Sequence, residues 1–124
     1  MNKGVVAIST VLVLGVVLSF VTLTLTSLSI GEAQSAFGLF RGEDTLQFVE
    51  GCAEDYMLKI RTQGSGFTAG NITRPEGTCS IVVNAGDPNW DITVSTTGSA
   101  YRRTVNVIFT RTSSGISLTS WKEI

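Results

Sequence analysis

Hydrophobic and polar positions divide the chain into three stretches, and the first is almost entirely apolar. Val5 to Ile30 is a run of 26 residues without Asp, Glu, Lys or Arg. A helix crosses the bilayer core with about 20 apolar residues, whereas the apolar region of a signal peptide has about 7–15. The run therefore predicts a transmembrane helix. Lys3 precedes it and Glu32 follows it, so the positive-inside rule places residues 32–124 outside the cytoplasm.

Part of this run, "TLTLTSLSI", alternates with the period of a strand. A lone strand cannot satisfy its backbone in lipid, so a helix is favoured there as well. We expect its hydroxyls to bond to the preceding helical turn and to suit contact with other helices. The hydroxyls belong to Thr22, Thr24, Thr26, Ser27 and Ser29.

The second stretch predicts an amphipathic helix over residues 32–62, which ends at the glycines of "TQGSG". Glycines weaken helices, so we expect a bend or a loosened turn near Gly31 or Gly38–Gly42. Asp55 and Lys59 are spaced for an ion pair along the helix. The apolar stripe follows the spacing i, i+3, i+4, i+7 and comprises Thr45, Phe48, Val49, Cys52, Ala53, Tyr56, Met57 and Ile60.

The third stretch, about residues 70–122, predicts short antiparallel strands joined by the turns "RPEG", "AGDPN", "TGS" and "TSSG". Trp121 is out of phase with Ile116 and Leu118, which indicates a bulge or a rim position. The predicted fold class is α+β, a long N-terminal helix packed on a small antiparallel sheet. The expected inward residues are Cys79, Ile81, Val83, Trp90, Ile92, Val94, Tyr101, Val105, Val107, Phe109, Ile116 and Leu118.

Composition narrows the chemistry. The formal net charge is −1 and there is no histidine, so a global basic field for nucleic acid and the usual general base are both missing. The sequence contains no nucleophile–base pair, phosphate-binding loop or metal cluster. We expect no enzyme activity, no metal and no cofactor. Cys52 and Cys79 most simply form a disulfide outside the cytoplasm, with two buried thiols as the alternative.

Three weaker motifs have simpler explanations. Asp87, Asn89 and Asp91 resemble the start of a calcium loop, but the later ligand positions are missing, so a turn is favoured. Tyr101 with Arg102, Arg103 and Arg111 could form a basic patch, yet a strand sends neighbouring arginines to opposite faces. Asn71–Ile72–Thr73 matches the N-glycosylation sequon, a short pattern that carries little weight on its own.

The layout resembles the type IV pilin-like proteins, which include pilins, minor pilins and type II secretion pseudopilins. The resemblance covers the whole chain: the leader "MNKG", the opening "KGVVAISTVLVL", the helix motif "EGCAED" and the closing "SWKEI". It implies cleavage after Gly4 by a prepilin peptidase and N-methylation of the new terminus, Val5. Major pilins carry glutamate at the fifth mature position, which is Ser9 here, so the chain is most similar to minor pilins and tip pseudopilins.

The resemblance implies a leader of residues 1–4, a membrane and assembly helix of residues 5–31, and an extracytoplasmic domain of residues 32–124. Its expected partners are other pilin or pseudopilin subunits, the prepilin peptidase and an inner-membrane assembly platform. Val5 to Ile30 would serve membrane residence and then filament assembly at the cell surface. The alternative is a single-pass anchored or secreted β domain that binds or adheres without polymerising.

Overall fold

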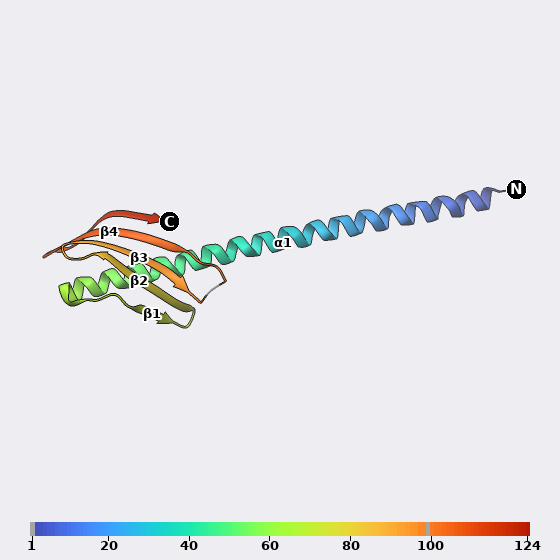
Figure 1. Ribbon diagram of the computed structural model, residues 1–124. Coiled ribbons are helices and arrows are strands. Elements are labelled where there is room, and N and C mark those ends of the chain that lie inside the picture. The colour runs from blue at the N-terminus through green and yellow to red at the C-terminus, as the bar shows by residue number, and fades with distance from the viewer. Residues whose placement is uncertain (1, 99) are drawn as a thin grey trace. The chain divides into compact units, whose positions relative to one another are not determined.

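The structure is a computed structural model that describes residues 2–98 and 100–124. It has one long N-terminal helix followed by a five-stranded antiparallel sheet, which confirms the predicted α+β class (Figure 1). Two compact units result, one ending at Leu39 and the other spanning Phe40–Ile124. The elements are α1 (Lys3–Gln63), the 3-10 turn η1 (Gly64–Gly66), β1 (Asn71–Arg74), β2 (Gly77–Ala85), β3 (Asn89–Thr97), β4 (Thr104–Thr112) and β5 (Gly115–Glu123).

Helix α1 contains 61 residues and joins the two predicted helical stretches into one element. It continues through Gly31, Gly38 and Gly42 without interruption. The two units of the chain divide at Leu39, and the bend or loosened turn expected near Gly31 or Gly38–Gly42 stays a prediction. The helix ends at Gln63, directly before the glycines of "TQGSG" that were expected to end it. Gly64 begins η1 with φ of 70°, a left-handed conformation that glycine adopts without steric cost.

The five strands form a meander in which each strand pairs with its neighbours in the sequence. All four pairings are antiparallel, as the short turns between the apolar runs predicted. The predicted turn "TGS" includes residue 99, which lies outside the described residues. In this order β1 and β5 form the two edges of the sheet.

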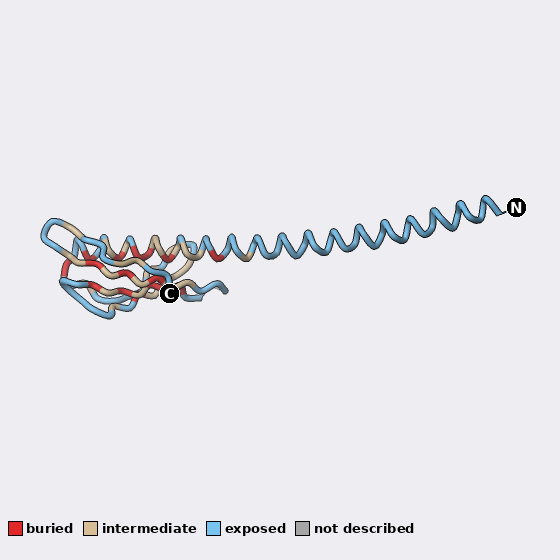
Figure 2. The backbone as a smooth tube through the Cα atoms, turned by 90° about the horizontal axis from the view of Figure 1, so that it is seen from above, coloured by how far each residue is buried: buried red, intermediate tan, exposed pale blue. Residues whose placement is uncertain are grey.

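The core lies between the inward face of the sheet and residues 49–60 of α1, which provide Val49, Cys52, Ala53, Tyr56 and Ile60. Along β3 and β4, buried residues alternate with partly buried ones, which Figure 2 draws in red and tan. This alternation follows the period-two pattern of the sequence. The buried strand residues are Cys79, Ile81, Trp90, Ile92, Val94, Val105, Val107 and Phe109, and Val83 is partly buried beside them.

The bulge expected near Trp121 is present in β5. Ile108 pairs with Ser120 and Phe109 with Leu118, so Thr119 has no opposite residue. The extra residue shifts the phase of the strand and turns the partly buried Trp121 toward the core, where it packs against the buried cluster.

Two expected core residues are placed differently. Tyr101 is 41% exposed and precedes β4, because the β3–β4 ladder ends at the pair Ser95–Thr104 and the chain then widens into a turn. Leu118 is 54% exposed on the edge strand. It lines an open groove with Met57 and Leu58 of α1 instead of being covered.

Candidate membrane and assembly segment

The first unit is a helix whose apolar side chains face solvent on all sides. Sixteen Val, Leu, Ile and Phe side chains between Val5 and Ile30 are 50–68% exposed. By length and composition, α1 is a candidate membrane span, and within the described part of the chain it is the one helix that meets both criteria. A helix that is apolar all round needs an apolar environment, either lipid or other helices.

Hydroxyl groups in this segment are satisfied within the helix. Thr22, Thr24 and Thr26 each donate to the carbonyl four residues earlier at 2.8 Å, as expected. Thr10 and Ser19 make the same bond at 2.8 Å. Among the described residues, Ser27 and Ser29 make none. A hydroxyl bonded to its own helix adds little desolvation cost in lipid, so these residues are compatible with a membrane span.

Small and hydroxyl side chains recur on one face of this helix at alternating steps of four and three residues. Helical geometry places residues at this spacing along one stripe. A Cβ atom built at Gly15 meets nothing within 4 Å beyond the adjacent helix backbone, so space is open there. Stripes of small residues let helix backbones approach closely in membranes. The stripe comprises Gly15, Ser19, Thr22, Thr26, Ser29 and Ala33.

The residues expected at the processing site, Gly4 and Val5, lie at the start of α1, followed by Ser9, which was expected to belong to the assembly helix. Gly4, Val5 and Ser9 are helical and exposed, as is Ile30 near the end of the apolar run. In this structure the helix begins at Lys3, one residue before the expected cleavage position. Cleavage after Gly4 and the role of Ser9 stay predictions.

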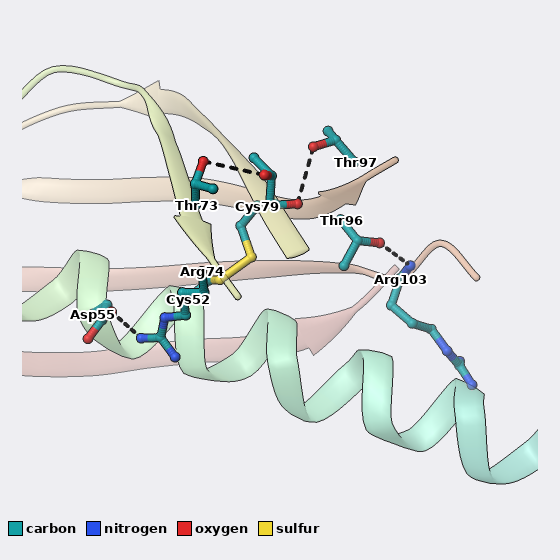
Figure 3. The surroundings of a disulfide bond; sticks show 9 residues. Cys52, Asp55, Thr73, Arg74, Cys79, Thr96, Thr97 and Arg103 are labelled. Carbon is teal, nitrogen blue, oxygen red and sulfur yellow. Dashed lines mark hydrogen bonds and ion pairs between the residues drawn. A yellow bond between two sulfur atoms is a disulfide. The ribbon is translucent and has the colours of Figure 1, made fainter. Parts of the chain in front are cut away.

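The predicted disulfide between Cys52 and Cys79 is present (Figure 3). It joins α1 to β2 across 27 residues, and both cysteines are completely buried. Beside it, Arg74 of β1 forms an ion pair with Asp55, the residue expected to pair with Lys59 along the helix. Both side chains are more than a third exposed, so this pair contributes little, about 0–1 kcal/mol. The disulfide is therefore the stronger link between helix and sheet.

Tyr56 is a buried polar residue. The sequence pattern placed its side chain in the core but gave no partner for its hydroxyl. Its side chain is completely buried and packs edge-to-face on Phe67 with ring centroids 4.6 Å apart. Among the described residues, its hydroxyl has no hydrogen-bond partner. Burial raises the pKa of Tyr56 above the ordinary value of 10.0.

Two of the three arginines of the expected basic patch, Arg103 and Arg111, are engaged in contacts within the domain. Arg103 pairs with Glu123 at 2.5 Å, and Arg111 lies 3.5 Å from Asp87. A Cβ atom built at Gly42 would lie 3.0 Å from a guanidinium nitrogen of Arg103. A Cβ atom at Gly64 would be equally close to Arg111. Sequence reasoning missed these arginine–glycine contacts, for which the only signal was glycine on a helix that packs against the sheet.

The acidic residues of the broken calcium motif also have protein partners. Asp87 accepts a hydrogen bond from Trp90 Nε1 at 3.4 Å, and Asp91 accepts bonds from Asn84 and Asn106 at 3.2 and 2.6 Å. Asp87 lies in the β2–β3 turn, as the turn interpretation predicted. Within the described residues, no three His, Cys, Asp or Glu side chains are grouped closely enough to hold a metal ion.

Searches of protein-family models, curated proteins and solved structures find no match to this chain.

Proposed function

We propose that this chain is a minor-pilin-like structural subunit. In this proposal it is inserted in the membrane by Val5–Ile30, processed after Gly4, and assembled through its N-terminal helix into a type IV pilus or a related secretion or uptake filament. The single observation that supports it best is the continuity of α1. One uninterrupted helix contains the exposed apolar segment Val5–Ile30 and also supplies, with residues 49–60, one layer of the domain core.

Continuity matters because it places the apolar segment and the helical layer of the domain in one element of secondary structure, with no loop between them. The segment is apolar all round and therefore needs lipid or other helices as its surroundings. Within the domain, the disulfide joins α1 to β2 at Cys52. The sequence resemblance to pilin-like proteins points to the proposed assembly role, with pilin or pseudopilin subunits, a prepilin peptidase and an inner-membrane platform as partners.

The alternative function is a single-pass anchored module that binds or adheres through its β domain and never polymerises. The exposed apolar segment supports this function too, because lipid alone could cover it. The stripe of small and hydroxyl residues favours association with other helices, since lipid contact requires no such stripe.

Intact-mass analysis of the mature chain separates the two functions. Assembly as a pilin-like subunit predicts a chain that begins at methylated Val5. A chain that retains Met1, or one that begins at Gln34 after signal-peptidase cleavage, contradicts it. Gly4→Leu should block cleavage, and Gly15→Ala, which leaves the peptidase site intact, is the processing control.

A cross-linking experiment tests association through the helix. Ser19→Cys lies on the small-residue stripe, and Val17→Cys lies on nearly the opposite side of the helix. Both native cysteines are in the disulfide, so each variant carries a single free thiol. We expect Ser19→Cys to cross-link in membranes to a second copy or to another helix-bearing subunit, and Val17→Cys to react much less. Equal reaction of both variants would contradict association through this face.

A further inference from the structure

We infer that Asn71 is a glycan attachment site, with the glycan transferred to its side-chain amide from a lipid-linked donor outside the cytoplasm. This inference rests on the membrane topology of the proposed function but not on filament assembly. Asn71–Ile72–Thr73 is the one N-x-[ST] tripeptide among the five asparagines of the sequence. The sequon alone is a weak signal, and its placement in the fold supplies the argument.

The sequon forms most of β1, and its residues alternate between exposed and partly buried positions. Asn71 and Thr73 are exposed, while Ile72 is partly buried and packs against the core. Asn71 and Thr73 are two residues apart on a strand, so their side chains point to the same face. The two groups that define the sequon are thus presented together, and the middle residue anchors the strand.

The acceptor amide is accessible. Among the described residues, the Asn71 side chain has no hydrogen bond, ion pair or ring contact. A Cβ atom built at the preceding Gly70 meets nothing within 4 Å, so space is also open on that side. Thr73 Oγ1 accepts a bond from Thr78 at 3.3 Å, which leaves its own hydroxyl proton available to a transferase.

The position on an edge strand adds a second reason. The strand order leaves one side of β1 unpaired, so an enzyme can read its extended backbone by strand addition. An open edge is also a hazard for unwanted pairing with other chains. The opposite edge, β5, carries a bulge and Lys122, both of which discourage pairing. A glycan on Asn71 gives β1 the equivalent protection.

The transfer involves a glycan held on a lipid pyrophosphate as the co-reactant. Asn71 Nδ2 forms a bond to the anomeric carbon of the glycan, and the bond from that carbon to the pyrophosphate oxygen breaks. The amide nitrogen loses one proton, and the lipid pyrophosphate departs with the bonding electrons. No oxidant or reductant takes part. The sugar chemistry can vary, because the sequon specifies the acceptor and leaves the donor glycan open.

The test uses the full chain produced in its own host, with the mass measured for the intact chain and for the peptide that contains Asn71. The wild-type chain should carry a glycan mass on Asn71. Asn71→Gln and Thr73→Val should abolish it, while Thr73→Ser, which keeps the hydroxyl, should retain it. Valine preserves the shape and the strand preference of threonine, so Thr73→Val separates loss of the sequon from loss of the fold.

An unmodified Asn71 in the wild-type chain overturns the inference, as does a glycan that persists in Thr73→Val. Protease accessibility of the domain is measured on spheroplasts from the same cultures, in which an extracytoplasmic domain is no longer shielded by the outer cell layers. An accessible domain with unmodified Asn71 rejects the glycan site alone. A protected domain shows that the proposed topology, and with it the proposed function, is wrong too.

Discussion

Removing the Cys52–Cys79 disulfide should cost the domain a large part of its stability. The bridge closes a loop of 27 residues. In the chain-entropy model, such a loop lowers the entropy of the unfolded chain enough to stabilise the fold by about 3.5 kcal/mol at 25 °C. A small domain has a total stability of roughly 4–13 kcal/mol at about 0.05–0.15 kcal/mol per residue. The bridge therefore accounts for between a quarter and most of the total.

The assay is urea unfolding of the full chain in detergent micelles, followed by tryptophan emission. Trp90 is 3% exposed, so unfolding should shift its emission. Relative to wild type, Cys52→Ala/Cys79→Ala should lower the urea midpoint by about 1.2–3.5 M, given a slope of about 1–3 kcal/mol per molar. Because alanine also removes two buried sulfur atoms, wild type that has been unfolded, reduced and refolded serves as the matched control.

Reduced wild type retains both side chains and loses only the crosslink. If it unfolds at the same urea concentration as oxidised wild type, the loop-closure argument is refuted. If reduced wild type is unaffected but the double alanine variant is destabilised, the effect comes from core packing. A loss shared by both samples supports the crosslink as the origin.

Three further changes test other parts of the structure. Tyr56→Phe removes a buried hydroxyl without a partner among the described residues and should raise stability by about 1 kcal/mol. Because the pKa of Tyr56 is raised in the folded state, this tyrosine loses its proton at a lower pH in the unfolded chain than in the folded one. The free energy of unfolding of the wild type should therefore fall above pH 10.0, and that of Tyr56→Phe should fall less, measured by urea titrations at alkaline pH. Gly64→Ala puts an alanine in a left-handed backbone conformation, with its methyl group against Arg111. It should lower the free energy of unfolding by about 1–2 kcal/mol, measured by urea unfolding. Leu18→Arg places a charge near the middle of the apolar run, which costs about 2.5–3.5 kcal/mol of membrane-insertion free energy. Carbonate extraction should therefore leave less Leu18→Arg than Leu18→Phe in the membrane fraction.

Local pattern was enough to predict most of the domain. Period-two alternation identified the inward residues of β2, β3 and β4, and a break in that phase identified the bulge before Trp121. Tyr101 was misplaced because it is in phase with Val105 and Val107, although the β3–β4 ladder ends at Thr104. The end of a ladder depends on where the partner strand stops pairing. The alternation of residues within one strand carries no information about its partner.

The candidate site was predictable only in its local features. The backbone bonds of the threonine hydroxyls follow from helical geometry and were expected. The contacts of Arg103 with Gly42 and of Arg111 with Gly64 join residues far apart in the sequence. Such contacts arise from how helix and sheet pack, which the pattern within a single strand does not report.

The apolar segment decides which environments the chain can occupy. Covering a large apolar side chain gives about 1.5–3 kcal/mol, so the sixteen exposed side chains between Val5 and Ile30 amount to some tens of kcal/mol. That sum exceeds the stability of the domain and forbids a lasting stay of this segment in water. It does not distinguish lipid from a bundle of similar helices, because both are apolar. In the proposed assembly, close packing along Gly15, Ser19 and Thr22 would decide between the two, because the hydroxyls of Ser19 and Thr22 are bonded within the helix in either environment. A subunit that must leave the membrane to assemble requires this near balance, and a permanent anchor does not.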